Sequence, residues 1–284
     1  MNHPKADSCS RRTFEGGSCG SADRLYDPRA IAIVLSFFVS LAVNAAFFAV
    51  AASRRTDVVT DLSYSLSFAV LAIVLPFSGA REPLQLAASA MVLVWAVRLG
   101  GYLFRRILRI KVDHRFDEMR DRPLRFARFW LLQAVSVAVI MLPVSYVLGR
   151  DTAPAFGPWA IAGGAIWLIG LVIEAVADAQ KSSFKSTSKG RNGFITSGLW
   201  RYSRHPNYFG EMLVWWGLFV FAVPFLGGAA FAVVIGPLFI TLLLLFVSGI
   251  PLLERSAEAK HGDDPAYREY KRRTSLLVPL PPRS

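Results

Sequence analysis

The sequence predicts an all-α membrane protein, a bundle of about seven transmembrane helices. Of its 284 residues, 54% are apolar and only 18% are charged, and its mean hydropathy is +0.41. This composition is too apolar for an ordinary soluble domain and too rich in aliphatic and aromatic residues for a disordered chain. The net charge of +12 would suit a nucleic-acid-binding protein, but such a protein would not carry apolar runs long enough to cross a bilayer. We therefore expect a membrane, and no nucleic acid, as the partner.

Seven runs of about 18 or more mostly apolar residues account for the predicted spans. The first, fourth and seventh runs contain no Asp, Glu, Lys or Arg. The other four each carry an ionisable residue, namely Asp61, Arg98, Glu174 and Glu211. In chain order, the predicted spans are residues 30–52, 58–79, 84–104, 129–148, 159–177, 208–226 and 229–253.

The rest of the chain divides into a tail and a single domain. Residues 1–29 are rich in Ser, Gly, Asp and Arg, which is typical of a disordered tail. No linker interrupts residues 30–284, so we expect one membrane-embedded domain there. The two cysteines, Cys9 and Cys19, both lie in the tail. The sequence therefore predicts neither a disulfide framework nor a cysteine metal site in the core, and we expect no metal.

The distribution of positive charge predicts the orientation, because loops rich in Lys and Arg remain on the cytoplasmic side. The segments after the first, third and fifth spans, together with the C-terminal tail, hold 24 of the 32 Lys and Arg residues, and the opposite side holds 7. We therefore expect a cytoplasmic C-terminus and an N-terminus that faces outward, in the inner or plasma membrane.

Cationic side chains at the end of the third span allow two interpretations. Inside a span a charge costs roughly 2.5 to 3.5 kcal/mol on insertion scales, so each is a candidate for a functional site. Arg98 lies within the span, whereas Arg105, Arg106 and Arg109 follow at its end, where long side chains reach the headgroups. Arg98, Arg106 and Arg109 are thus either membrane anchors or part of a cofactor site.

Two acids at the end of the fifth span require a partner. Glu174 and Asp178 are four residues apart and share one helical face, at a helix end where the dipole disfavours carboxylates. Lys181 and Lys185 follow on the same row, so a solvated ladder of ion pairs along one helix is one interpretation. The other is a polar wall that receives the hydroxyls and phosphates of a ligand.

Residues 193–211 form the most informative stretch of the sequence. A Gly- and Arg-containing loop leads into an apolar helix whose first turn accommodates Pro206. Asn207 and Glu211 are four residues apart and point to one face, and a Glu within this apolar segment requires a cavity, a polar side chain or a ligand. The cations before it, which include Lys185, Arg201, Arg204 and His205, suit a polyphosphate, although the positive-inside rule would also place them there.

The run Arg-Tyr-Ser-Arg-His-Pro-Asn-Tyr-Phe-Gly-Glu at residues 201–211 resembles the signature of the DUF1295 membrane proteins, relatives of the steroid 5-alpha-reductase C-terminal domain family. Other segments agree: Trp-Ala-Val-Arg-Leu at 95–99 with Tyr102, the segment 174–185, and Ile-Pro-Leu-Leu-Glu-Arg at 250–255 followed by Tyr-Arg-Glu-Tyr. The resemblance covers most of residues 55–282.

The resemblance implies a seven-helix bundle that holds NADPH in a cavity open to the cytoplasm and reduces an activated carbon–carbon double bond of a lipid enone. It further implies that Asn207 and Glu211 hold the nicotinamide end, and that Asp178 and Lys185 bind the ribose and diphosphate. Bulky apolar residues in the second to fourth helices indicate a hydrophobic substrate that enters from the bilayer.

The resemblance also assigns the residues over the phosphates. It implies that Tyr202, with Arg201 or Arg204, lies there. Glu174 stands where the steroid enzymes have Asn, and Lys185 stands where they have Arg. The second difference removes a guanidinium that could bind a phosphate through two parallel hydrogen bonds.

The donor to the substrate carbonyl is the remaining catalytic requirement. The steroid enzymes use a Glu in the second helix and a Tyr in the third. Here the only acid of the second span is Asp61, and the nearby phenols are Tyr64 and Tyr102. Hydride addition to an enone requires a donor that stabilises the developing enolate, and a Tyr beside a buried carboxylate would serve. We expect Glu211, Tyr102 and Asp61 to be catalytic, while noting that Asp61 could cap its own helix and Tyr102 could lie at the interface.

Two other functions remain open. The isoprenylcysteine carboxyl methyltransferases, which bind S-adenosylmethionine, share the Arg-His-Pro-x-Tyr-x-Gly core and have a similar late Glu. They commonly show a Glu-Glu pair after the last span, where this chain has Glu254 and Arg255, so we favour the reductase. A non-catalytic lipid-binding protein of the same fold is the third alternative, but it would still need a reason to keep acids in apolar helices.

Overall fold

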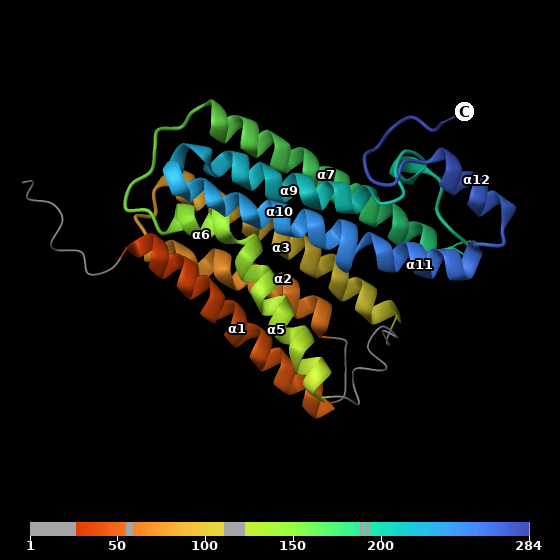
Figure 1. Ribbon diagram of the computed structural model, residues 1–284, viewed down its shortest axis with the longest axis horizontal. Coiled ribbons are helices and arrows are strands. Elements are labelled where there is room, and N and C mark those ends of the chain that lie inside the picture. Colours follow the sequence, from red (N-terminus) through yellow and green to blue (C-terminus); the bar gives the residue numbers. More distant parts are fainter. Residues whose placement is uncertain (1–26, 55–58, 111–122, 188–189, 191–192, 284) are drawn as a thin grey trace, which may run out of the picture.

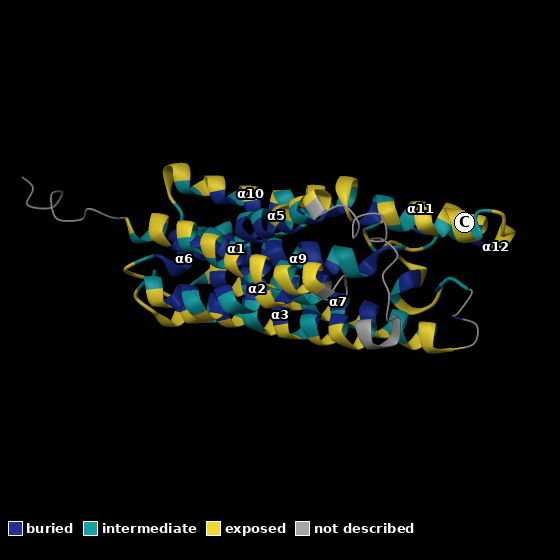
Figure 2. Ribbon diagram, turned by 90° about the horizontal axis from the view of Figure 1, so that it is seen from below, coloured by how far each residue is buried: buried dark blue, intermediate teal, exposed yellow. Residues whose placement is uncertain are grey.

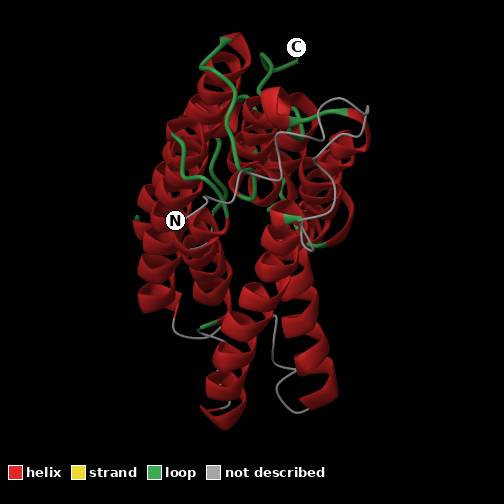
Figure 3. Ribbon diagram, turned by 90° about the vertical axis from the view of Figure 1, so that its left-hand side faces the viewer, coloured by secondary structure: helices red, strands yellow, loops and turns green. Residues whose placement is uncertain are grey.

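Helices dominate the computed structural model, which describes residues 27–54, 59–110, 123–187, 190 and 193–283 (Figure 3). Within these residues no β-strand is present, and the one isolated bridge joins Ser203 to Ser275. The elements are α1 (Pro28–Arg54), α2 (Thr60–Val74), η1 (Leu75–Ser78), α3 (Pro83–Ile110), α5 (Pro123–Ile140), α6 (Leu142–Leu148), α7 (Pro158–Ser186), η3 (Gly198–Arg201), α9 (Pro206–Ala222), η4 (Val223–Phe225), η5 (Gly228–Val234), α10 (Ile235–Leu242), η6 (Leu243–Val247), α11 (Ile250–His261) and α12 (Pro265–Arg273).

Proline fixes where many of these helices begin. Its missing N–H costs nothing at the first position of a helix, and its φ is already close to the helical value. Prolines therefore open helices here rather than interrupt them, with one exception described below. Pro28, Pro83, Pro123, Pro158, Pro206 and Pro265 stand at the first positions of α1, α3, α5, α7, α9 and α12.

All seven predicted apolar runs are helical, but the number of membrane spans is smaller than seven. In the described part of the chain, five helices are long and apolar enough to cross a bilayer, and a sixth span results if α5 and α6 are counted together. Those two meet at a bend of 56°, where Pro143 cannot donate a hydrogen bond to the carbonyl of Val139. The second predicted run appears as the shorter apolar helix Leu62–Ser78. The first span begins at Pro28, two residues before the expected boundary.

The bundle has two parts that meet along α2 and α3 (Figure 1). Helices α7 and α9 lie side by side and antiparallel, with α3 and α10 alongside them. Helices α1, α2 and α5 form the second part. The end of α7, together with α11, α12 and the C-terminal segment, lies at one end of the molecule. That end contains the polar residues considered below.

Many large apolar residues are exposed on the outside of the bundle, and the buried residues lie in its interior (Figure 2). Phe38 on α1, Val97 on α3 and Ile161 on α7 are 59%, 63% and 60% exposed. In a soluble monomer such long apolar faces would be unusual. Together with the span lengths, they fit an integral membrane protein.

Glycines allow α7 and α9 to approach backbone to backbone, as in many membrane helix pairs. A Cβ placed on Gly163 would lie 2.3 Å from the backbone nitrogen of Phe221, and one placed on Gly217 would lie 2.5 Å from that of Trp167. Near the polar end, a Cβ on Gly210 would lie 2.6 Å from the backbone nitrogen of Glu174. Because Glu211 follows Gly210, this contact brings two acids of different helices to one level of the bundle.

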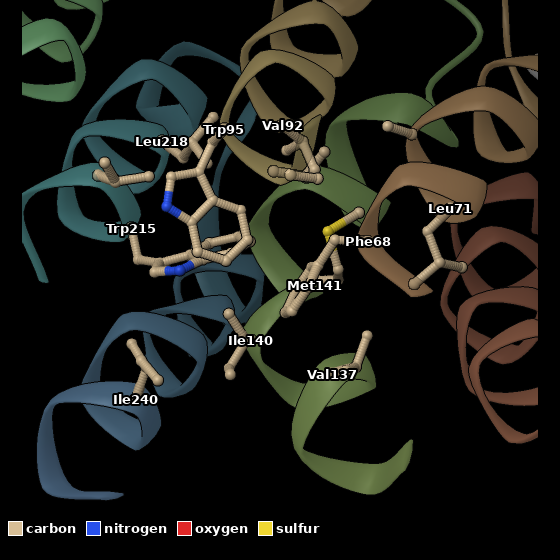
Figure 4. Packing of buried hydrophobic residues seen from close by; sticks show 14 of the residues in the cluster. Phe68, Leu71, Val92, Trp95, Val137, Ile140, Met141, Trp215, Leu218 and Ile240 are labelled. Carbon is tan, nitrogen blue, oxygen red and sulfur yellow. The ribbon is translucent and has the colours of Figure 1, made fainter. Parts of the chain in front are cut away.

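Three large aromatic rings form the centre of the core (Figure 4). The ring centroids of Trp95 and Trp215 are 5.1 Å apart, and Phe68 lies 5.2 Å from the first and 5.0 Å from the second. These side chains come from α3, α9 and α2 and are fully or almost fully buried. One turn along α2, Tyr64 contacts Phe68 edge to face at 5.0 Å. This aromatic cluster lies directly beside the buried acids.

A network of uncharged hydrogen bonds joins α1, α2 and α5. The amide nitrogen of Gln133 donates to the side-chain oxygens of Asn44 and Ser63, at 2.8 Å each. Asn44 in turn donates to Ser67 Oγ at 3.1 Å. The polar groups of this network are paired within the protein, and such pairing stabilises helix contacts in a bilayer.

We expect Gln133→Leu to lower the free energy of unfolding by about 1 to 2 kcal/mol, because the buried Asn44 Oδ1 loses its donor and Ser63 Oγ keeps only its bond to the carbonyl of Thr60. The midpoint of thermal unfolding in detergent measures the change. Ser53→Ala is the control, since the exposed Ser53 hydroxyl only contacts its own helix. Equal midpoints for the two variants would show that the network contributes no stability.

Candidate functional site

Arg98 of α3 holds two acids of α7 in the interior. Its Nη1 donates to Asp178 Oδ2 at 2.9 Å, and its Nη2 donates to Glu174 Oε1. Trp95, one turn away on α3, donates its indole N–H to the other oxygen of Glu174 at 2.9 Å. Glu174 and Asp178 are only 3% and 4% exposed. Of the two interpretations of these acids, the structure therefore excludes a solvated ladder along α7 alone, because their partner is on another helix.

Glu211 of α9 is a third acid beside the same guanidinium. Its residue is 9% exposed, and it interacts electrostatically with Arg98 and Asp178 and with Glu174. Among the residues that the structure describes, none makes a hydrogen bond to its carboxylate. Three buried acids thus lie around one guanidinium, where like charges are close together.

Tyr64 of α2 faces this cluster of acids. Its phenol interacts electrostatically with both Glu211 and Glu174, and its ring contacts Phe68 of the aromatic cluster. We define the polar centre as Tyr64, Arg98, Glu174, Asp178 and Glu211. It is built from four helices, and the aromatic cluster closes one side of it.

Helix lengths indicate the depth at which the polar centre would lie in a bilayer. A hydrocarbon core of about 30 Å corresponds to about 20 helical residues. A core that begins at Pro158 on α7 therefore ends near Asp178, and one that begins at Phe225 ends near Pro206 on α9. Glu174 and Glu211 then lie about one turn within the core, whereas Lys181, the loop 193–205 and α11 extend beyond it.

A second cluster lies beyond that boundary, around Glu254 of α11. Glu254 accepts hydrogen bonds from Arg204 Nη1 and, at 2.8 Å, from His205 Nε2. The ring of Tyr208 stacks on that of His205, with centroids 5.8 Å apart and 12° between the planes. Burial lowers the pKa of His205 below 6.5 more than Glu254 raises it, so His205 is neutral at pH 7.

The C-terminal segment, residues 274–283, fixes the loop that carries this cluster. The backbone N–H of Arg204 donates to the carbonyl of Ser275 at 2.9 Å, and that of Leu280 donates to the carbonyl of Tyr202 at 3.1 Å. Ser203, which is fully buried, donates its hydroxyl to the carbonyl of Leu277 at 2.6 Å. The chain end is therefore part of the architecture of the site.

Cations are distributed unequally around the two clusters. The ammonium of Lys181 lies 4.6 Å from the centroid of the Trp200 ring and interacts electrostatically with Arg106 and Lys185. Lys185 is exposed, as are Arg201 and Tyr202, and the guanidinium of Arg201 lies 6.0 Å from the Tyr202 ring. The exposed cations are thus available to a phosphate, whereas Arg204 is already paired.

Several buried polar atoms at the site have no partner among the described residues. Burying such an atom unpaired costs about 1 to 3 kcal/mol, so a group of them marks a place built for additional partners. The atoms are Arg98 Nε, Asp178 Oδ1, Arg204 Nε, His205 Nδ1 and Asn207 Oδ1. Within the described part of the chain, no group of three or more His, Cys, Asp or Glu is arranged to hold a metal ion.

The structure brings together four of the residues that the sequence indicates: Arg98, Glu174, Asp178 and Glu211 meet in the polar centre. Tyr102 is partly buried and packs against the core. The side chains of Asp61 and Arg109 lie outside the described residues. Of the remaining predicted residues, Lys185 and Arg106 interact electrostatically with Lys181, and Arg204 and His205 pair with Glu254. Arg201, Tyr202 and Asn207 lie in the same stretch of chain, between η3 and the start of α9.

Sequence reasoning missed the roles of two contributors and placed a third outside the expected catalytic set. Glu254 binds both Arg204 and His205, although it lies about 50 residues further along the chain. Trp95 is a donor to Glu174, and Tyr64, named only as a nearby phenol, interacts electrostatically with Glu211. The available signal was weak: Glu254 is an acid at the end of an apolar run, and Tyr64 lies four residues before Phe68 on one helical face.

Comparison with known proteins identifies relatives without a described activity. The family model described as "Protein of unknown function (DUF1295)" matches residues 47–274. An uncharacterized protein of Schizosaccharomyces pombe is 24% identical over 241 residues, which are 72% of this chain and 68% of that protein. No solved structure gives a significant match.

Proposed function

This chain belongs to the DUF1295 family, and from that premise we propose that it is a membrane-bound, NADPH-dependent reductase of an activated carbon–carbon double bond in a lipid enone. The observation that carries the proposal is the polar centre. A phenol and three acids with one arginine lie at the depth of the lipid chains, beside an aromatic cluster. Burying these ionisable groups in a membrane helix bundle costs free energy, so they are candidates for a functional site.

The residues at the site fit NADPH in their donor and acceptor chemistry. The unpartnered buried atoms include acceptors on Asp178, His205 and Asn207, which suit the hydroxyl and amide groups of a dinucleotide. Lys185 and Arg201, which are exposed, would hold the phosphates. Arg106 and Lys181 add positive charge close to Asp178. When bound, NADPH supplies hydride, and the protein places the substrate against it.

The proton-transfer residues in this proposal are Tyr64 and Glu211. The Tyr64 hydroxyl donates a hydrogen bond to the substrate carbonyl and passes its proton to that oxygen as negative charge develops there. Glu211, which interacts electrostatically with Tyr64, holds the proton that replaces the one transferred. The aromatic cluster excludes water from one side of the polar centre.

The proposal also specifies an orientation. The polar end, with its concentration of Lys and Arg, faces the cytoplasm, where NADPH is available, and the C-terminus lies on that side. The protein then lies in the inner or plasma membrane, and its lipid substrate enters from the bilayer between helices.

Purification in mild detergent, followed by mass spectrometry of the co-purifying nucleotide, tests the proposal. We expect NADPH, and we expect the purified protein to bind NADPH more tightly than NADH, because the surplus cations can meet a 2′-phosphate. Equal affinity for the two nucleotides would contradict the preference. Recovery of lipid without any nucleotide would favour a non-catalytic lipid-binding protein.

One observation favours a second candidate, a methyltransferase that uses S-adenosylmethionine. Glu254 pairs with Arg204 and His205, which removes two groups from the set that could neutralise a diphosphate. S-adenosylmethionine carries no phosphate and would need fewer cations. Recovery of this cofactor or its demethylated product in the same experiment would decide for the methyltransferase.

A further inference from the structure

The ring of His205 is fixed by several contacts. Its Nε2 lies 2.8 Å from Glu254 Oε1, and Tyr208 stacks on one face of it. Its backbone N–H donates to Ser203 Oγ at 3.1 Å, and Ser203 is in turn bonded to the C-terminal segment. A ring held in this way cannot turn over to exchange its two nitrogens without breaking the contact with Glu254.

These contacts determine which nitrogen carries the proton. Glu254 is the ion-pair partner of the Arg204 guanidinium, so it is a carboxylate and can only accept hydrogen bonds. The Nε2 atom must therefore be the N–H donor. In a neutral imidazole the other nitrogen, Nδ1, is then an acceptor.

That acceptor is buried and has no partner in the part of the chain that the structure describes. His205 is 5% exposed, so water does not reach it freely. Two residues further along the chain, Asn207 Oδ1 is also buried and has no hydrogen-bond partner among the described residues. Acceptors of this kind require donors, whereas a phosphate offers only further acceptors.

We infer that the turn 205–207 binds a hydrogen-bond donor of the ligand, a hydroxyl or an amino group, through His205 Nδ1, and that it does not bind a phosphate. Glu254 is then a positioning residue that selects the tautomer. The assignment of this donor to NADPH rests on the proposed function, but S-adenosylmethionine also carries ribose hydroxyls and amino groups. This inference changes the role that the sequence suggested for His205, from a cation near phosphates to a neutral acceptor.

The inference predicts a pH dependence with a definite sign. Protonation converts Nδ1 from an acceptor into a donor, so binding weakens as the pH falls through the pKa of His205 and is retained above it. Burial, Lys181 of α7 and Arg204 of the loop lower this pKa, whereas Glu254 of α11 raises it, and Tyr208 of α9 contributes an uncharged ring. The transition is therefore expected below pH 6.5.

Two substitutions of His205 separate its two nitrogens. Gln extends its amide N–H to the position of Nε2 and so retains a donor to Glu254, but it has no acceptor at the position of Nδ1. Asn places its amide oxygen near the position of Nδ1 but cannot reach Glu254. We expect the dissociation constant for NADPH to rise about tenfold in His205→Gln, and to rise less in His205→Asn.

Nitrogen NMR of the full-length protein labelled at histidine gives a readout that does not depend on activity. At pH 8 we expect His205 to carry its proton on Nε2 and none on Nδ1, and the Nδ1 signal to shift when NADPH is added. A protonated Nδ1 would overturn the inference, as would equal binding of NADPH by His205→Gln and the wild type. If the wild type does not bind NADPH, the proposed function fails, while the protonation of Nδ1 still decides the tautomer.

Discussion

Glu211→Gln is expected to lower the rate of enone reduction at least about 100-fold while the protein remains folded. Gln matches Glu in size and in its capacity for hydrogen bonds, but it can neither release nor take up a proton, and loss of a positioned proton-transfer group costs about 10²- to 10⁴-fold. Turnover by protein in lipid nanodiscs, followed by NADPH consumption with sterol, long-chain and polyprenyl enones, measures the effect.

The control is Glu258→Gln on α11. The Glu258 side chain is 51% exposed and pairs with Lys271 at 2.5 Å, so its removal changes surface charge at the same end of the molecule without touching the polar centre. We expect this variant to keep wild-type turnover. Full activity of Glu211→Gln would remove Glu211 from the mechanism, and equal losses in both variants would attribute the effect to general electrostatics.

The helices could be predicted from the sequence because their signals are local. Each predicted apolar run is helical, and prolines such as Pro83 and Pro158 open the helices where their missing N–H is harmless. The number of spans was harder to predict, because hydropathy does not show that Pro143 bends a run by 56° or that the second apolar helix is short. Those features depend on how the backbone hydrogen bonds are satisfied by neighbouring helices.

The sequence predicted those parts of the candidate site in which the spacing of residues along one helix shows that they share a face. Glu174 with Asp178, and Asn207 with Glu211, are four residues apart on single helices, and both pairs lie at the polar end. The partners of these residues come from elsewhere in the chain: Arg98 for the acids of α7, and Glu254 for His205. No sequence period links such positions, so their pairing depends on the packing of the bundle.

The choice of phenol illustrates the same limit. The sequence favours Tyr102 as the donor and leaves Tyr64 as the other nearby phenol. The position of Tyr64 depends on the rotation of α2, and that rotation is fixed by Phe68, which packs against Trp95 and Trp215. Because Tyr64 is one turn from Phe68, it is carried to the side of the helix that faces Glu211.

Gly163→Ala is expected to disrupt the glycine contact between α7 and α9, the two helices that carry Glu174 and Glu211. The added Cβ would lie 2.3 Å from the backbone nitrogen of Phe221 and 2.7 Å from the carbonyl oxygen of Gly217. Since backbone atoms cannot rotate away, the helices must separate. We expect a loss of about 1 to 3 kcal/mol or more in the free energy of unfolding, seen as a fall of several degrees in the midpoint of thermal unfolding.

The neighbouring glycine provides the matched control. A Cβ on Gly164 would meet no atom within 4 Å, and Ala is favoured over Gly inside a helix by roughly 0.5 to 1 kcal/mol. Gly164→Ala should therefore unfold at the same temperature as the wild type or slightly above it. Because Gly163 and Gly164 are adjacent, opposite effects can only arise from the face that each presents to α9. If both variants keep the wild-type midpoint, the close approach does not hold α7 against α9, and the geometry of Glu174 and Glu211 must be maintained by the hydrogen bonds of Arg98 and Trp95 instead.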